Sequence, residues 1–166
     1  MVKESKLTEL KLKTPKGEVK YRIGQKFGNQ GVDKNGNVIP KSARMLAYGD
    51  ARYVMDKLDK IVGAGNWSNC FHRDEKGILF CTITITFERK DGVVDTISKT
   101  DCGTESNVEK QKGEASDAFK RAGVHLGIAR DLYNLPKDVS YKAEMNEFNG
   151  KYYPPKNWRP EANKGV

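Results

Sequence analysis

The segment from Val108 to Gly127, VEKQKGEASDAFKRAGVHLG, carries the residues best suited to hold an anion. Its charged residues alternate with small ones, whereas a fully buried helix would be more apolar. Lys120 and Arg121 are adjacent, so a helix can present two cations to one anionic ligand. Small residues let a ligand's backbone come close to such cations, and here they are Gly113, Ser116 and Gly123. The segment therefore has the residue types that phosphate contacts in nucleic-acid binding need.

The helical period separates an apolar face of this segment from a polar one. At about 100° per residue, Lys120 lies about 200° from Ala122 and must face away from the apolar stripe. That stripe consists of Ala115, Ala118, Phe119, Ala122, Leu126 and Ala129. A neighbouring column, Lys110, Glu114, Asp117 and Arg121, has spacings at which side chains pair along a solvated helix. The small residues equally fit tight helix packing, so spacing alone leaves both interpretations open.

Further cations that could contact phosphates lie outside this segment. Arg52 belongs to a predicted first helix, and Arg22, Lys26 and Arg44 belong to a predicted first hairpin. The net charge of +8 suggests an anionic partner. Residues 1–41 carry ten Lys and Arg against four Asp and Glu, whereas residues 42–136 carry fourteen of each. Any polyanion site in the middle of the chain must therefore arise from arrangement, because its bulk charge is balanced.

Catalytic motifs are not evident in the sequence. His72 and His125 lack the spacing of paired metal ligands, and His125 fits a structural role on its helix. Neither GxxxxGK[ST] nor GxSxG occurs, so nothing indicates ATP use or a serine hydrolase. Asp95, Lys99 and Asp101 resemble a nuclease strand but have no partner motif, which leaves a metal-dependent nuclease as the less favoured alternative. We expect a protein that is not an enzyme and needs no cofactor or metal.

Length and composition are those of a single intracellular domain. The chain has 166 residues, enough for a real core. No apolar run approaches the ~20 residues of a membrane span, and the first residues lack the apolar core of a signal peptide. Cys70, Cys81 and Cys102 form an odd set without CxxC spacing, which favours reduced thiols. We expect a cytoplasmic location in a bacterial cell or a phage-infected host.

Periodicity predicts an α+β fold with the order β-β-α-β-β-β-α. The clearest signal is the alternation of apolar residues and threonines over Leu79–Phe87, the middle strand of a predicted antiparallel meander. One face of the meander should pack on helices, and the other should be rich in Thr, Ser and Lys. The meander and the long helix after it form a β-β-β-α core, preceded by a β-hairpin and a helix. The predicted strands are Lys20–Phe27, Ala43–Tyr48, Trp67–Arg73, Leu79–Phe87 and Val93–Cys102, and the predicted helices are Asp50–Val62 and Ser106–Arg130.

The same patterns divide the chain into three parts. Residues 1–19 are Lys-rich without a clear period, so we expect a basic, weakly ordered arm. Residues 20–136 form the predicted binding domain. Residues 137–166 mix aromatics, prolines and cations and read as a tail that contacts another subunit or packs on the core. Aromatics between Tyr152 and Trp158 could alternatively stack on bases.

Three motifs, in order, resemble the Rad-fifty-two superfamily of single-strand DNA annealing proteins, which includes phage Sak and bacterial DdrA proteins. The helix EKQKGEASDAFKRAGVHLG is similar to the family's EKxxKEAxTDAxKRAxxxxG. AYGDARYVMDKLDKIVGAGNWSN resembles its helix, glycine loop and tryptophan, and FERKDG followed by DCGTES resembles its turn and glycine-bearing junction. The resemblance covers about residues 20–135, and its most specific part is the helix.

The resemblance implies an ATP-independent protein that anneals complementary single strands in recombination or double-strand-break repair. Members assemble into rings or filaments that hold the DNA backbone in a basic groove with bases exposed. By position, Arg52, Lys120 and Arg121 match its phosphate contacts, with weaker candidates Lys99, Lys110, Lys112, Arg22, Lys26 and Arg44. The implied partners are single-stranded DNA, the annealed duplex, further copies of the chain, and a single-strand-binding protein or phage exonuclease. A DNA-end protector that does not anneal is the alternative.

The chain departs from the family pattern at several places. Ala64 stands where well-known members have an aromatic residue, and Val124 stands where they have a further arginine. The junction between Thr104 and Val108 is shorter and lacks the stretch that holds a lysine of a proposed second DNA site. The large carboxy-terminal partner-binding region of eukaryotic members is absent from this sequence.

Overall fold

The computed structural model describes the backbone of residues 1–104, 110–133, 141–144, 146–148 and 151–153, and side chains up to 104 and over 112–133. The chain divides into two compact units. Unit 1 comprises Met1–Val19 and Gly49–Asn134, and unit 2 comprises Lys20–Tyr48 and Leu135–Val166. The predicted domain 20–136 is thus divided, because the hairpin forms a sheet with the strand at 141–144 and not with the meander.

The centre of unit 1 is the predicted antiparallel meander. Its strands are β3 (Trp67–Arg73), β4 (Leu79–Glu88) and β5 (Val94–Cys102), in the order β3-β4-β5. Alternate residues of β4 are buried, including Cys81, Ile83 and Ile85, as the period of two predicts. The opposite face carries the threonines and serines, and Thr82 and Thr100 share a hydrogen bond of 2.8 Å across it. The α+β fold with a β-β-β-α core is confirmed.

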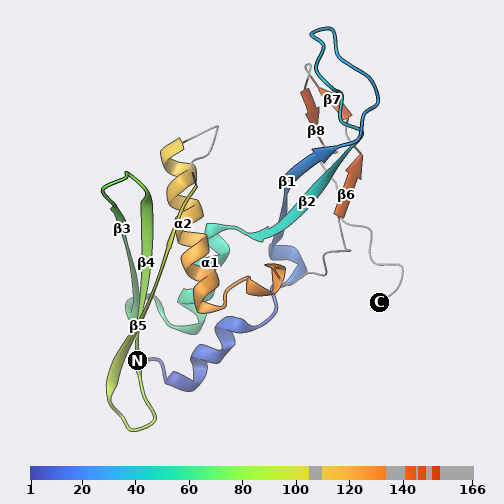
Figure 1. Cartoon of the computed structure of the whole chain (residues 1–166). Coiled ribbons are helices and arrows are strands. Elements are labelled where there is room, and N and C mark those ends of the chain that lie inside the picture. The colour runs from blue at the N-terminus through green and yellow to red at the C-terminus, as the bar shows by residue number, and fades with distance from the viewer. Residues whose placement is uncertain (105–109, 134–140, 145, 149–150, 154–166) are drawn as a thin grey trace. The chain divides into compact units, whose positions relative to one another are not determined.

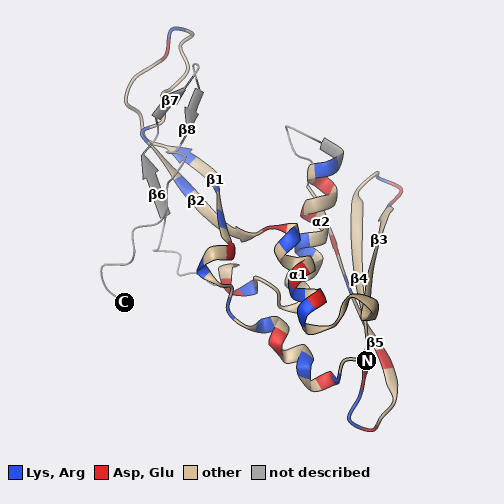
Figure 2. Cartoon of the chain, turned by 180° about the vertical axis from the view of Figure 1, so that it is seen from behind, with Lys and Arg blue, Asp and Glu red and all other residues tan. Residues whose placement is uncertain are grey.

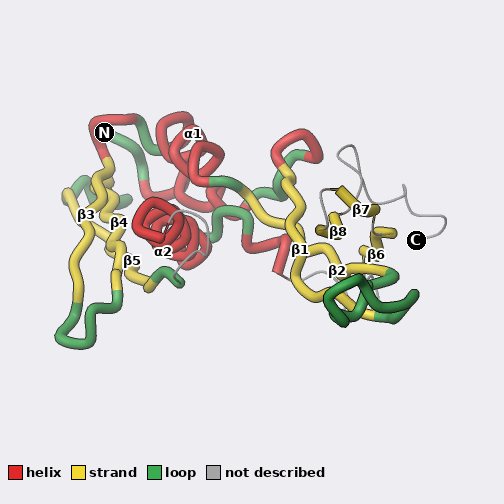
Figure 3. The backbone as a smooth tube through the Cα atoms, turned by 90° about the horizontal axis from the view of Figure 1, so that it is seen from above, coloured by secondary structure: helices red, strands yellow, loops and turns green. Residues whose placement is uncertain are grey.

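Helix α2 (Lys110–Leu126) covers the apolar face of this sheet (Figures 1 and 3). Ala118, Phe119 and Ala122 are buried, so the predicted stripe does face the core. The helix ends earlier than predicted, because Gly127 takes a φ of 106° that favours glycine. The amide of Ile128 then donates to the carbonyl of Gly123 at 3.1 Å and closes the last turn. The predicted start at Ser106 lies outside the described residues.

Helix α1 (Ala51–Ile61) packs beside α2 (Figure 3). Asp50 caps it by accepting a hydrogen bond of 2.9 Å from the amide of Tyr53. Val54 and Leu58 are buried, in agreement with the predicted stripe. Its close approach to α2 depends on Gly123, since a Cβ atom there would lie 2.8 Å from Cγ1 of Val54. A short 3-10 turn, η3 (Ala64–Asn66), leads into β3.

The amino-terminal segment is part of unit 1, which differs from the expected weakly ordered arm. It forms two 3-10 turns, η1 (Glu4–Lys11) and η2 (Lys16–Glu18). Val2 and Leu10 are buried in the core, with Leu10 only 2% exposed. Thr14 is tied to Asp131, at the turn η4 (Arg130–Tyr133), by hydrogen bonds of 2.7 and 3.0 Å. Two apolar anchors and this polar link order a segment whose composition is otherwise charged.

Unit 2 contains a three-stranded sheet in the order β1-β2-β6. Its strands are β1 (Val19–Phe27), β2 (Ser42–Gly49) and β6 (Tyr141–Glu144), and a separate pair joins β7 (Asn146–Phe148) to β8 (Lys151–Tyr153). The hairpin was predicted, whereas β6 to β8 lie in the expected irregular tail. The tail beyond 153, with Trp158, lies outside the described residues. In the described part of the chain, no helix is long and apolar enough to cross a membrane.

Candidate nucleic-acid interface

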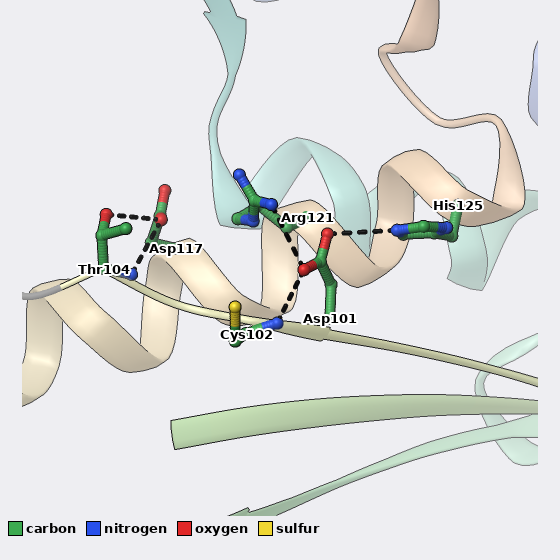
Figure 4. A network of polar contacts seen from close by, with 6 residues as sticks. All are labelled: Asp101, Cys102, Thr104, Asp117, Arg121 and His125. Atoms are coloured by element: carbon green, nitrogen blue, oxygen red, sulfur yellow. Dashed lines mark hydrogen bonds and ion pairs between the residues drawn. The ribbon is translucent and has the colours of Figure 1, made fainter. Parts of the chain in front are cut away.

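The predicted cation pair lies on α2, and carboxylates hold both members. The guanidinium Nη2 of Arg121 is 3.3 Å from Oδ1 of Asp101 on β5 (Figure 4). The ammonium Nζ of Lys120 is 3.6 Å from Oδ1 of Asp117, one turn earlier on α2. The Arg121 side chain is 42% exposed and that of Lys120 is 23% exposed. Both cations therefore keep access to solvent while already sharing their charge with an acid.

Asp101 is the centre of this network (Figure 4). Its Oδ1 also accepts a hydrogen bond of 2.7 Å from the amide of Cys102, and its Oδ2 lies 3.1 Å from Nε2 of His125. Burial would raise the pKa of Asp101, but the Cys102 amide, then Arg121 and His125, outweigh burial and hold this pKa below its ordinary value. Asp101 therefore stays ionised and fixes the Arg121 guanidinium beside β5. His125 contacts this carboxylate from the last turn of α2.

The guanidinium of Arg121 also has a buried, unused donor. Its Nε atom is buried and makes no hydrogen bond within the described part of the chain. Burial lowers the pKa of this guanidinium, but the charge of Asp101 and then its hydrogen bond raise the pKa by more, so the net shift is upward. Arg121 is thus a permanent cation whose planar fork is aimed by Asp101 and whose outer edge reaches solvent.

The column that includes Arg121 pairs mainly with the sheet and its flanking loop. Glu114 is buried, with Oε2 2.7 Å from Nη2 of Arg73 on β3. Oδ2 of Asp117 accepts bonds of 3.1 and 3.2 Å from the hydroxyl and amide of Thr104 (Figure 4). Of the two interpretations left open above, the pairing one describes these residues better. The partners of Glu114 and Asp117 named here come from the sheet and its flanking loop, and the Asp117–Lys120 contact follows the helix.

Gly103 brings the end of β5 against α2. A Cβ atom at this position would lie 2.2 Å from the carbonyl oxygen of Glu114 and 3.0 Å from the amide nitrogen of Ala118. These are backbone atoms of the helix, so no side-chain rotation could make room. The contact places Asp101 and Thr104 opposite Arg121 and Asp117, and the glycine is therefore what allows the network to form.

The other predicted phosphate contacts of unit 1 lie on three different elements, α1, β5 and α2. Arg52 is exposed on α1 and has no ion pair or hydrogen-bond partner among the residues that the structure describes. Lys99 pairs in register with buried Ile83, so it lies on the helix-covered face of the sheet, opposite the face of Thr96, Ser98 and Thr100. Lys112 is exposed on α2. The side chain of Lys110 lies outside the described part of the chain.

The predicted hairpin cations are brought together on one face of unit 2. Arg22 and Lys26 are exposed and alternate with the half-buried Tyr21 and Ile23 on β1. Arg44 is exposed between the buried Ala43 and Met45 of β2. The prediction missed Lys20, which belongs to the same exposed set of β1. The alternation of KYRIGQK in the sequence could have identified it.

No metal site is found among the described residues, since no three His, Cys, Asp or Glu side chains of that part gather around one point. His72 instead stacks on Phe80, with ring centroids 5.3 Å apart and planes 11° from parallel. Asp95 and Asp101, the nuclease-like pair, lie on the same face of β5, where Asp95 is 3.9 Å from Arg89. Each carboxylate of this pair contacts an arginine, Asp95 contacting Arg89 and Asp101 contacting Arg121.

No family model matches the chain. Over 125 residues, it is 35% identical to a protein named single-stranded DNA-binding protein DdrA from Deinococcus deserti. This chain is similar to DdrA. The match covers 72% of the chain and 59% of that DdrA. The DdrA of Deinococcus radiodurans is 35% identical over 97 residues, which are 57% of the chain and 43% of that protein. The chain therefore spans about half the length of the curated DdrA relatives that it matches.

Proposed function

We propose that this protein binds single-stranded DNA and anneals complementary strands without ATP, as an oligomer, in homologous recombination and double-strand-break repair. The similarity to two DdrA proteins that are named for single-stranded DNA binding carries the binding part of the proposal. The net charge of +8 supports an anionic partner. Annealing and oligomerisation rest on the resemblance of the α2 sequence to the Rad-fifty-two superfamily.

In this mechanism the cations of α1 and α2 hold backbone phosphates. Arg52, Lys120 and Arg121 make the principal contacts, and the supporting ones come from Lys99, Lys110, Lys112, Arg22, Lys26 and Arg44. A guanidinium has five N–H donors, so Arg121 can bind a phosphate with its exposed edge while Asp101 holds Nη2. Asp101 then acts as a positioning residue. Lys120 would exchange Asp117 for a phosphate at little cost, since a helical ion pair between residues i and i+3 is worth about 0.2–0.5 kcal/mol.

Annealing needs no chemical step by the protein. A strand held by its phosphates keeps its bases available for a complementary strand, and each stacked step of the new duplex contributes about 1.4 kcal/mol. The protein has to concentrate and align the strands, and base pairing supplies the driving force. This mechanism uses neither nucleotide hydrolysis nor a metal ion.

An annealing assay tests the proposal directly. Two complementary oligonucleotides, one with a fluorophore and one with a quencher, are mixed with the protein in the absence of ATP. We expect fast quenching with the wild type and its loss in the variant Lys120→Ala/Arg121→Ala. The variant Lys76→Ala/Lys90→Ala is the matched control, because it removes two exposed lysines from turns of the same unit. Equal annealing by both variants, with circular dichroism showing them folded, would remove α2 from the site.

A single-strand binder that protects DNA ends without annealing is the second candidate. The name of the DdrA relatives favours it, since that name states binding and says nothing of annealing. The two functions differ in one comparison. A pure protector shields a labelled strand from an added exonuclease but leaves the rate of pairing unchanged. A magnesium-dependent loss of the labelled strand without added exonuclease would instead indicate a nuclease.

Oligomerisation is proposed because one protomer of 166 residues offers a short surface for a strand. Light scattering with and without a long oligonucleotide measures it. We expect a mass several times that of the 18.7 kDa chain. A monomer under both conditions would contradict this part of the proposal.

A further inference from the structure

The largest concentration of charge lies in the hairpin of unit 2. Residues 20–48 contain six Lys and Arg and a single acid, Asp33, so they carry +5 of the chain's +8. Figure 2 shows Lys and Arg recurring along β1 and β2, with no Asp or Glu on either strand. In contrast, α2 and the sheet of unit 1 mix both signs. Most of the net positive charge of the chain therefore lies in a segment of 29 residues.

These cations share a face of the sheet. Lys20, Arg22 and Lys26 occupy alternating, exposed positions of β1. Gly24 belongs to the same set, and a Cβ atom on it would lie 2.6 Å from Cγ of Leu46, so Leu46 of β2 lies over that face too. Arg44 is two residues from Leu46 and therefore points to the same side.

Among the residues whose side chains the structure describes, none neutralises the hairpin cations. Lys20, Arg22, Lys26 and Arg44 have no ion-pair or hydrogen-bond partner among the described residues. The one acid of the segment, Asp33, is occupied by its own loop, where it accepts bonds from Asn35 and Asn37 at 2.8 to 3.1 Å. On α2, by comparison, each cation of the predicted pair already faces a carboxylate. A phosphate that binds the hairpin therefore competes with no carboxylate of the described residues, whereas on α2 it competes with Asp101 or Asp117.

We infer that the β1–β2 hairpin is the main electrostatic anchor for the phosphodiester backbone of nucleic acid. Phosphates bound at the hairpin release more counterions from the nucleic acid than phosphates bound at α2. The inference rests on the proposed function and assigns most of its salt-dependent affinity to unit 2. Alternate residues of a strand are about 7 Å apart, so the hairpin presents a line of charges that suits a linear polyanion. Leu46 is the one large apolar side chain exposed on this face of β1 and β2, fewer than a membrane-surface site requires.

The salt dependence of binding tests the inference. Fluorescein-labelled (dT)30 is titrated with the full chain at several salt concentrations, and the slope of log K against log salt is measured. Each phosphate neutralised on a single strand adds about 0.7 to that slope, so the variant Lys20→Gln/Arg22→Gln/Lys26→Gln/Arg44→Gln should lose up to about 2.8. The control variant Lys6→Gln/Lys60→Gln/Lys76→Gln/Lys90→Gln removes the same charge from exposed positions of unit 1 and should lose much less.

Two further arms keep the result interpretable. The variant Arg22→Lys/Arg44→Lys preserves the charge and should keep the wild-type slope of log K against log salt. The variant Lys120→Gln/Arg121→Gln should reduce this slope less, per charge removed, than the hairpin variant does. Equal losses in the hairpin and control variants, or binding to phosphatidylserine vesicles in place of (dT)30, would overturn the inference. If the wild type binds a 30-bp duplex through the hairpin but does not bind (dT)30, the proposed function fails and the anchor survives. If it binds neither nucleic acid, both fail.

Discussion

The contact between Gly103 and α2 gives a sharp test of how the site is built. In Gly103→Ala, the new methyl group would lie 2.2 Å from the Glu114 carbonyl oxygen and 3.0 Å from the Ala118 amide nitrogen. Overpacking usually costs about 1–3 kcal/mol, and here the obstacle is helix backbone, so we expect a loss of about 3 kcal/mol or more. For a chain of this length, that loss lowers the unfolding midpoint by about 6–12 °C.

Thermal unfolding followed by far-UV circular dichroism measures the effect. Gly65→Ala is the matched control, because Gly65 has an ordinary φ and open space where the Cβ atom would be. This control should stay close to the wild type. If Gly103→Ala unfolds within about 2 °C of the wild type, less than 1 kcal/mol was lost and the close approach of β5 to α2 is wrong. The placement of Asp101 opposite Arg121 would then lose its structural basis.

Three other outcomes follow from the same unit. Gly123→Ala should destabilise the protein, because its methyl group would lie 2.8 Å from Val54, and Val54→Ala should relieve this clash. A double-mutant cycle of unfolding free energies should then give a coupling of about 0.5–3 kcal/mol between the two sites. Strictly additive free energies would refute the α1–α2 contact. Burial raises the pKa of the Cys81 thiol to about 11, so a thiol reagent at pH 8 should label exposed Cys70 well before Cys81. Equal labelling rates of the two thiols in the folded protein would refute the burial of this face of β4. The pKa of Asp101 is lower in the folded state than in the unfolded chain, so its stabilisation is present above the unfolded pKa and is lost as the pH falls through the folded one. The free energy of unfolding, measured with urea, should therefore fall less on acidification in Asp101→Asn than in the wild type. If this free energy changes with pH in the same way in both proteins, the Asp101 network is contradicted.

The elements of the fold were predictable where the chain repeats a local pattern. The period of two over Leu79–Phe87, bounded by the turns DEKG and RKDG, identified the meander, and β3 has the predicted bounds. The apolar stripes predicted both helices because packing on one face requires them. The strands β6 to β8 were missed, since short strands in a mixed aromatic and charged stretch give no periodic signal.

The pairing of charges was not predictable, because it depends on contacts distant in sequence. Arg73 and Asp101 lie 41 and 20 residues before their partners Glu114 and Arg121, so helix spacing contains no information about them. The folded conformation of the amino-terminal segment also depends on distant contacts, because Val2 and Leu10 pack into a core that later residues form. Lys120 and Arg121 were identified as cations accessible from solvent, but not as cations already held by acids.

Equilibrium binding of single-stranded DNA tests the central proposal most directly. Fluorescein-labelled (dT)30 is titrated with the purified chain at low salt, without ATP or magnesium, and fluorescence anisotropy is measured. We expect saturable binding that weakens steeply as salt is added, with no change when ATP is supplied. An anisotropy that stays at the value of free oligonucleotide throughout the titration would contradict single-stranded DNA binding by this protein.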